Sequence, residues 1–293
     1  MERKRLVKLG RRRVSTYAAT VQRGRPESVE RLVMLKSIRV LVVPFLWVVL
    51  VHGQTIPQSD PQALALAAQS IAAMTGGMLI RDMTLTANTT WTAGSNTETG
   101  TATLRAKGLA ESRVDLALSG GTRSDIRNSS PGYAQGAWVG NDGVSHPYAQ
   151  HNCWTDAVWF FPALSSLTQT SNPSFIFKYI GQEQREELAV QHIQLFQVVP
   201  NDTDGLFLRL STVDFYLDAS TYLPLAVTFE THSDHDLNTD ISAEIQFANY
   251  QTVNGVMVPL HVQKLLNETV LLDVTVTDAV FNAGLSDSPF SLQ

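Results

Sequence analysis

The sequence is poor in cysteine and in charge, and both shortages limit what the chain can be. Cys153 is the only cysteine among 293 residues, so an intrachain disulfide is excluded. Charged residues make up 17% of the chain and hydrophobic residues 44%, which is the composition of a globular protein. A chain of this length buries enough apolar surface to fold without disulfides.

Long hydrophobic runs are missing as well. The longest, residues 40–51, is about a dozen residues, whereas a membrane-spanning helix needs roughly 20. It follows Lys36 and Arg39 and gives way to polar residues after Gly53, which indicates a secretory signal peptide over residues 34–53. A short membrane anchor is the alternative. We expect a periplasmic or secreted, soluble protein that keeps no integral membrane segment after signal cleavage.

Basic residues become scarce after this segment. Residues 1–53 hold twelve Lys and Arg and three Asp and Glu, whereas residues 54–293 hold ten and twenty-four and carry −14. Our hypothesis is that Met34 is the true start and that residues 1–33 are a misassigned basic extension; a genuine basic cytoplasmic tail is the alternative. The extension lacks interleaved aromatics, so nucleic acid is not an expected partner. Residues 54–293 are expected to form a single β-rich domain.

Motifs for catalysis and cofactor binding are absent from the sequence. It contains no nucleophile elbow and no glycine-rich phosphate loop, so we expect no cofactor, no catalytic residue and no enzyme. Two polar clusters, residues 146–153 and 232–236, contain His, Asp and Cys153, but their spacing fits no zinc pattern and no metal site is predicted. An enzyme of unrecognised type is an alternative that would need these two loops to face each other.

The most informative pattern present is strict alternation over residues 213–276. Val213, Phe215 and Leu217, for example, alternate with polar neighbours, and a period of two places one face in a core and the other in water. Asn254-Gly255 is suited to a tight hairpin turn, and short connections indicate antiparallel neighbours. The pattern predicts five consecutive strands, at residues 213–218, 223–230, 241–247, 256–262 and 270–276.

Helical and strand patterns also precede this meander. Asp60-Pro61 opens an Ala- and Leu-rich helix over residues 63–74. A second apolar helix is predicted over residues 154–168, with Trp154, Val158 and Phe161 at helical spacing. Pro162 is expected to kink this helix or to start a new turn there. Further strands are predicted at residues 79–92, 101–106, 112–119, 122–128, 137–139, 175–180 and 187–199, and residues 282–293 are expected to be a terminal extension.

Local sequences in the meander resemble those of a known superfamily. Tyr216-Leu217-Asp218 followed by Leu223-Pro224-Leu225, then residues 245–250 and 255–259, resemble a hairpin and strand pair of the periplasmic lipoprotein-carrier (LolA/LolB-like) superfamily. The resemblance covers residues 60–290 in plan and 213–262 in sequence, and residues 120–155 depart from it. It implies a mainly β (α+β) fold in which a half-open antiparallel β-barrel is wrapped on helices. It also implies binding of acyl chains without catalysis.

The resemblance and the aromatic segment together predict an exported protein that binds an apolar ligand, the acyl chains of a lipid or lipoprotein, in a half-barrel cavity. A barrel filled by its own side chains would instead indicate an interaction or sensor module with an envelope protein as partner. The predicted ligand-binding residues come from the aromatic lid and from the sheet: Trp154, Val158, Trp159, Phe161, Leu164, Phe215, Leu225, Val227, Ile245 and Val258. Packing of the same aromatic residues as ordinary core is the alternative.

Overall fold

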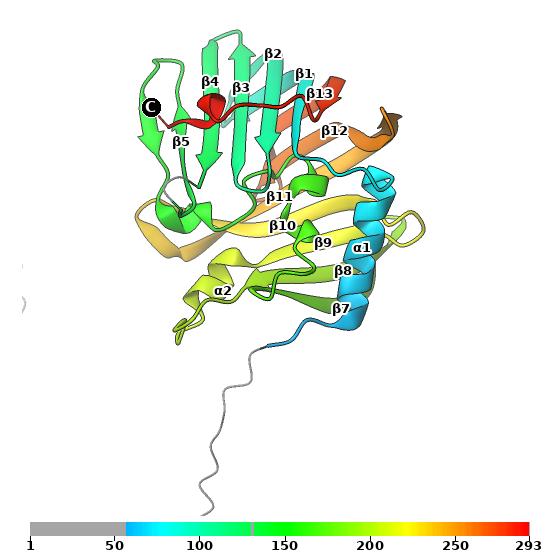
Figure 1. Ribbon diagram of the computed structural model, residues 1–293. Helices are drawn as coiled ribbons and strands as arrows, with labels where there is room; N and C mark the ends of the chain where they lie inside the picture. Colours follow the sequence, from blue (N-terminus) through cyan, green and yellow to red (C-terminus); the bar gives the residue numbers. More distant parts are fainter. Residues whose placement is uncertain (1–56, 130–131, 293) are drawn as a thin grey trace, which may run out of the picture. The chain divides into compact units, whose positions relative to one another are not determined.

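The computed structural model describes residues 57–129 and 132–292, which belong to one compact unit (Figure 1). The expected basic extension (1–33) and signal peptide (34–53) lie outside the described residues.

One antiparallel sheet of thirteen strands forms most of the described chain. Its order is β6-β5-β4-β3-β2-β1-β13-β12-β11-β10-β9-β8-β7, so the sheet has two wings, joined where β1 pairs with β13, and two free edges. The first wing contains β1 (Asp82–Ala93), β2 (Asn96–Lys107), β3 (Glu111–Leu118), β4 (Gly121–Asn128), β5 (Gln135–Val139) and β6 (Ser145–Pro147). The second contains β7 (Phe175–Arg185), β8 (Leu188–Gln197), β9 (Val213–Asp218), β10 (Pro224–Ser233), β11 (Asp236–Val253), β12 (Val256–Leu266) and β13 (Thr269–Phe281).

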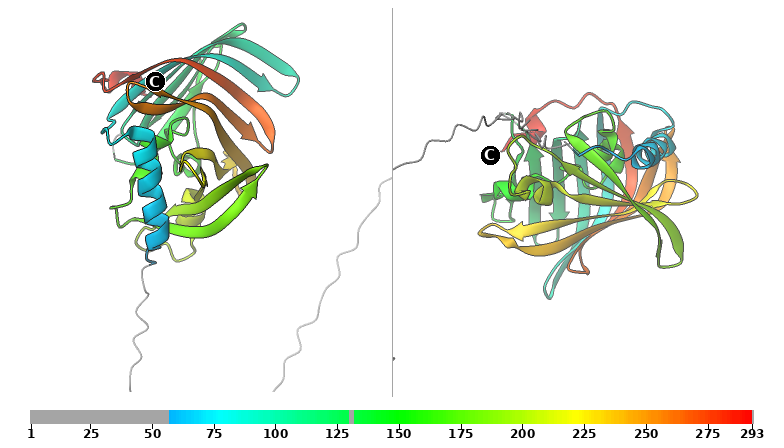
Figure 2. Two further views of the ribbon diagram at one scale, coloured as in Figure 1. Left: turned by 90° about the vertical axis from the view of Figure 1, so that its right-hand side faces the viewer. Right: turned by 90° about the horizontal axis from the view of Figure 1, so that it is seen from below.

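The sheet curls without closing, as the two views of Figure 2 show. Because a twisted sheet with one apolar face must cover that face, the curl encloses an interior between the two wings. This is the half-open antiparallel barrel that the sequence predicted, and the predicted fold class is confirmed.

The five predicted consecutive strands are β9 to β13, each paired with the next. Asn254 and Gly255 join β11 to β12 with φ angles of 51° and 84°, and Asn267 and Glu268 join β12 to β13 with 45° and 64°. Two successive positive φ angles are the geometry of a tight hairpin turn whose twist matches that of the strands.

One departure from the predicted alternation lies in β10. The register with β9 shifts between Pro224 and Ala226, so Leu225 is the extra residue of a β-bulge. Leu225 is consequently half-buried and lies outside the core cluster, while Val227 returns to the interior face.

Helix α1 (Pro61–Thr75) packs against β7, β8 and β12 through a buried stripe spaced three and four residues apart. The stripe consists of Ala63, Leu66, Ala67, Ser70, Met74 and Thr75. Gly76 ends the helix in the left-handed region, with its N–H donating to the Ala72 carbonyl at 2.9 Å. The predicted helix is confirmed.

Replacing Gly76 by alanine is expected to destabilise the protein in two ways, through its left-handed backbone and through a close contact with the β11–β12 turn. A Cβ on Gly76 (φ 58°) would lie 3.1 Å from the Gly255 carbonyl, whereas a Cβ on Gly108 (φ 57°) would meet nothing within 4 Å. Each Gly→Ala change is expected to lower stability by about 1 kcal/mol because of the left-handed backbone. We expect Gly76→Ala to cost more, because α1 must also move away from the β11–β12 turn. Equal losses in denaturant titrations of the two variants would contradict this close approach.

The free edge of β7 is partly covered by the residues that precede α1. The Asp60 N–H donates to the Phe177 carbonyl at 2.8 Å, and the Tyr179 N–H donates to Asp60 Oδ2 at 3.0 Å. The Asp60 side chain therefore bonds to the strand and does not cap its own helix. A paired edge is protected from joining another chain.

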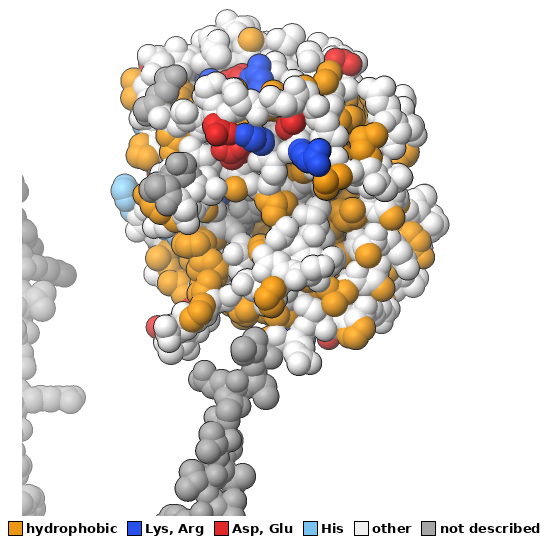
Figure 3. All heavy atoms as spheres, in the orientation of Figure 1, with side chains coloured by type: hydrophobic (Ala, Val, Ile, Leu, Met, Phe, Trp, Pro, Cys, Tyr) orange, Lys and Arg blue, Asp and Glu red, His pale blue; other side chains and the backbone are white. Residues whose placement is uncertain are grey.

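The C-terminal residues cross the outer face of β2, β3 and β4 (Figure 1). Phe290, in the short 3-10 turn Ser288–Phe290, is 1% exposed, and its carbonyl accepts a hydrogen bond from Asn128 Nδ2 at 2.8 Å. Lys107 pairs with Asp287. Figure 3 shows charged side chains gathered on this part of the face, with hydrophobic side chains more frequent below it. The segment is therefore packed onto the sheet.

The predicted second helix is wrong. Residues 150–168, here called the plug, form three 3-10 turns: Gln150–Cys153, Pro162–Leu164 and Ser166–Thr168. Phe161 is extended (φ −146°, ψ 94°), and Pro162 has no N–H to continue a helix. The helical spacing of apolar residues arises because this segment is buried on most sides. The part of the plug from Val158 to Leu167 supplies residues to the core cluster inside the half-barrel. The described residues also contain a short α-helix that the sequence did not predict, α2 (Leu206–Ser211).

Candidate ligand cavity in the half-barrel

Two adjoining cavities, each of about 400 Å³, open inside the half-barrel beside the plug. This volume lies within the range of small-molecule sites. Both are lined by Trp159 of the plug and Lys264 of β12, and they also share Asp125, Trp138, Tyr148 and Leu271. The shared residues make the two cavities a single candidate site with a junction at Lys264.

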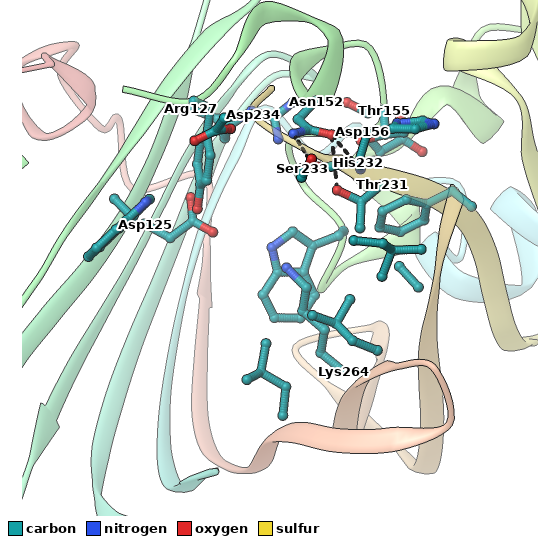
Figure 4. Close-up of a pocket in the computed structure, with 18 residues that line it drawn as sticks. Asp125, Arg127, Asn152, Thr155, Asp156, Thr231, His232, Ser233, Asp234 and Lys264 are labelled. Carbon is teal, nitrogen blue, oxygen red and sulfur yellow. Dashed lines mark hydrogen bonds between the residues drawn. The ribbon is translucent and has the colours of Figure 1, made fainter. Parts of the chain in front are cut away.

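The first cavity, cavity A, has one apolar wall and one polar rim (Figure 4). The apolar wall is formed by Phe229, Ile241, Ala243, Leu266 and Leu271, from β10 to β13. The polar rim is formed by Asn152, Thr155, Asp156, Thr231, His232, Ser233 and Asp234. Cavity A is therefore amphipathic, with its polar side at the plug.

The second cavity, cavity B, extends under the first wing and is more apolar. Trp91, Val114, Leu116, Val139 and Leu272 line it. Besides Lys264, cavity B has the basic side chain of Arg123, which stacks on the Trp91 ring at 4.2 Å and pairs with Glu98 at 3.0 Å. This pairing lowers the pKa of Glu98.

Register explains why charged side chains of β4 enter the barrel. Asp125 lies opposite Val114 and Arg123 opposite Leu116, and both partners are buried. Paired residues share a face, so Asp125 and Arg123 point inward, whereas Ile126 faces the C-terminal segment. The sequence predicted this strand, at residues 122–128, but did not indicate that Arg123 and Asp125 would face the interior.

The plug is fastened to β10 by a polar clasp centred on Asn152. Its Oδ1 accepts from the His232 N–H at 2.9 Å and from Thr231 Oγ1 at 3.1 Å, while its Nδ2 donates to the His232 carbonyl at 2.7 Å. His151 Nε2 also lies 3.0 Å from the Ser233 carbonyl. The two polar loops flagged in the sequence do face each other, and their contacts serve to hold the plug.

The described residues of these loops supply neither a cluster of metal ligands nor an activated thiol. Within residues 57–129 and 132–292, no three His, Cys, Asp or Glu side chains converge as a metal site requires. Cys153 is buried, and burial raises the pKa of its thiol, which disfavours the nucleophilic thiolate.

Asp156 anchors the far end of the plug. Its carboxylate accepts from the Ser166 N–H at 2.8 Å and the Ser166 hydroxyl at 2.9 Å. Burial nevertheless raises the pKa of Asp156 to about 6, with the Ser166 bonds and Arg127 opposing the rise. The folded state therefore binds this proton more tightly than the unfolded state, and the stability gained below the unfolded pKa is lost as pH rises through 6.

Asp156→Asn is expected to stabilise the protein at pH 8, because an amide can keep both Ser166 contacts without a buried charge. The gain is expected to be on the order of 1–3 kcal/mol at pH 8 and to shrink towards pH 4. Thermal unfolding of both proteins at the two pH values measures it, with the exposed Asp278→Asn as control. A difference independent of pH would show that Asp156 does not titrate as described.

The structure brings some of the predicted site residues to the cavities and places others in packed core. Trp159 lines both cavities, while Val158, Phe215 and Val227 surround a small void of about 10 Å³ behind it. Trp154 faces a separate surface cavity and packs edge-on against Phe207 at 4.1 Å. Phe161, Leu164, Ile245 and Val258 are buried in the core cluster and line neither large cavity, and Leu225 occupies the bulge.

Lys264 is the functional candidate that sequence reasoning missed. It lies opposite Ile245 of β11 and Leu272 of β13, both buried on the interior face. The signal was present in the sequence, because Lys264 continues the period of two that begins with Val258 and Val262.

Comparison with known proteins identifies the fold. No family model matches the sequence, and no curated protein matches it. Among solved structures, a domain assigned to outer membrane lipoprotein sorting from Vibrio parahaemolyticus has a TM-score of 0.50 and 14% identity, covering 78% of this chain and 96% of that one. A DUF1329 family protein from Desulfovibrio piger has a TM-score of 0.50 and 11% identity, covering 80% and 100%.

A LolA superfamily protein from Nitrosomonas europaea has a TM-score of 0.46 and 11% identity, covering 78% and 97%. Likeness at these identities concerns the fold alone. The expected fold-level resemblance to the lipoprotein-carrier superfamily is confirmed. Within the described residues, no helix has both the length and the apolar character needed to cross a bilayer.

Proposed function

We propose that this is an exported protein that binds the acyl chains of a lipid or lipoprotein in cavities A and B without catalysing a reaction. The observation that carries the proposal is the pair of adjoining cavities, each about 400 Å³, left open inside the half-barrel. The likeness in fold to a lipoprotein-sorting domain supports it. The signal-like segment at residues 34–53 supports export to the periplasm or outside the cell.

Acyl chains suit these cavities because their walls are built from aliphatic and aromatic side chains. Each methylene group transferred from water contributes about 0.8 kcal/mol, and this driving force needs no directional contacts. Trp159 is the predicted site residue placed to touch a chain in either cavity. The other buried residues of the plug would support the wall from behind.

A non-catalytic role agrees with the chemistry of the interior. Near the cavities, Asn152 and Asp156 are engaged in holding the plug, and the Cys153 thiol is buried. The proposed partners are therefore lipid or lipoprotein acyl chains, with an envelope protein as the alternative partner if the interior takes up no ligand.

The test is to purify the full chain without detergent and compare its native and denaturing mass spectra. A lipid that co-purifies with a defined mass would support the proposal and identify the ligand class. Titration of the delipidated protein with cis-parinaric acid, a fluorescent fatty acid, and with its uncharged methyl ester gives a second reading. A clean apo mass with no uptake of either probe would overturn the proposal in favour of an interaction module.

A further inference from the structure

Lys264 places a positive charge at the junction of cavities A and B. Its strand neighbours on the interior face are Ile245 and Leu272, and its Nζ lies 4.8 Å from the centroid of the Trp159 ring. Figure 4 shows Lys264 standing apart from the labelled polar residues of the rim. An ammonium group in such apolar surroundings is costly unless something compensates its charge.

No carboxylate pairs directly with Lys264 within the part of the chain that the structure describes. Lys264 makes no ion pair and no hydrogen bond there, and its contact with Trp159 is a cation–π contact. Most other basic residues of the described chain pair with carboxylates, although Arg127 of β4 donates to the Thr155 carbonyl at 3.2 Å. The carboxylate pairs are made by Arg105, Lys107, Arg113, Arg123, Lys178 and Arg185 of the sheet and by Arg209 of α2.

The charges of Asp125 and Arg127 offset each other near Lys264, so the lysine charge could be balanced by one further negative charge. Burial lowers the pKa of Lys264, Asp125 opposes this shift and Arg127 adds to it, so these two neighbours act in opposite directions. The other carboxylates of cavity A are engaged, Asp156 by Ser166 and Asp234 by the Ala149 N–H at 3.3 Å. A single point charge with one carboxylate already near it suits a monoanion better than a dianion.

The apolar walls of both cavities suit a hydrocarbon chain attached to that anion. Trp91, Val114 and Leu116 line cavity B, and Phe229 and Ile241 line cavity A, so a hydrocarbon chain could lie in either from a head group at Lys264.

We propose that the bound ligand is a free long-chain fatty acid whose carboxylate pairs with Lys264 at the junction of the cavities. This inference rests on the proposed function and narrows its ligand class to free fatty acids. An ester- or amide-linked acyl chain, as on a lipoprotein, has no carboxylate that could pair with Lys264. Lys264 thereby distinguishes a fatty-acid carrier from a carrier of neutral acyl chains.

The experiment compares cis-parinaric acid with its methyl ester, which has the same chain without the charge. Binding to the full chain is measured by fluorescence at pH 7.5, below the concentration at which the acid forms micelles. We expect the wild-type protein to bind the acid about tenfold or more tightly than the ester. Lys264→Met should lose that preference through weaker binding of the acid, and Lys264→Arg should retain most of it.

Lys178→Met is the matched control, because it removes a lysine charge that lies outside both cavities and pairs with Asp60. Thermal unfolding shows that each variant is folded, and Lys264→Met is expected to be at least as stable as wild type without ligand. Equal binding of acid and ester by the wild type, or unchanged acid binding by Lys264→Met, would overturn this inference and leave the proposed function standing. Binding of neither probe would overturn the proposed function itself.

Discussion

Phe161→Ala is expected to lower the free energy of unfolding by about 3–5 kcal/mol, the usual cost of removing a fully buried phenylalanine. Phe161 is 0% exposed and belongs to the core cluster that includes the plug and both wings of the sheet. Its ring lies 5.8 Å from that of Phe281 at the end of β13. The plug has no regular helix to hold it, so its position depends on such contacts more than on its own backbone bonds.

Urea titration of the full chain measures this loss, with Tyr133→Ala as the control because Tyr133 is 49% exposed. The control is expected to stay within about 0.5 kcal/mol of wild type. A loss below about 1 kcal/mol for Phe161→Ala would mean that the plug is not part of the cooperative core, and would favour a loosely attached lid.

The meander could be predicted because each of its signals is local. In β9, burial alternates with the sequence from Val213 to Leu217, and the turn residues Asn254 and Gly255 adopt the φ angles that their types favour. The period of hydrophobic residues, the turn residues and the strand pairing therefore agree. A segment can be predicted from its sequence when such local signals agree with the global fold.

The plug was mispredicted because apolar spacing reports burial and not backbone geometry. Val158 and Phe161 are both 0% exposed, as the helical interpretation required, but Trp159, Phe160 and Leu164 are buried too. A segment buried on most sides carries no periodicity that identifies a helix. Of the two expectations for Pro162, a kink or a new turn, the structure has the second, because Pro162 begins a separate 3-10 turn.

The cavities could not be predicted, since they depend on which residues meet across the two wings. Asp125 and Lys264 are 139 positions apart in the sequence and line the same space only because β1 pairs with β13. For the wall that contains β12, the sequence did offer a signal, because Lys264 continues the alternation of the buried Val258 and Val262. Nothing local to β4 indicated that its charged residues would form the other wall.

Filling the junction of the cavities is expected to weaken ligand binding without altering the charge of the site. Leu271 is half-buried and lines both cavities, so the larger indole of Leu271→Trp would occupy space proposed for an acyl chain. Displacing about two methylene groups would cost roughly 1.6 kcal/mol, which corresponds to binding about tenfold weaker. Because neither Lys264 nor the plug is altered, the loss would report volume alone.

Leu79→Trp introduces the same residue at a position that is 67% exposed and lines neither cavity, which makes it the matched control. Cis-parinaric acid and its methyl ester should lose affinity by the same factor in Leu271→Trp, since a steric effect acts on both chains. The Lys264→Met change should affect the acid alone. Full binding by Leu271→Trp would place the acyl chain elsewhere, whereas a loss confined to the acid would mean that the substitution disturbs Lys264 and not the space beside it.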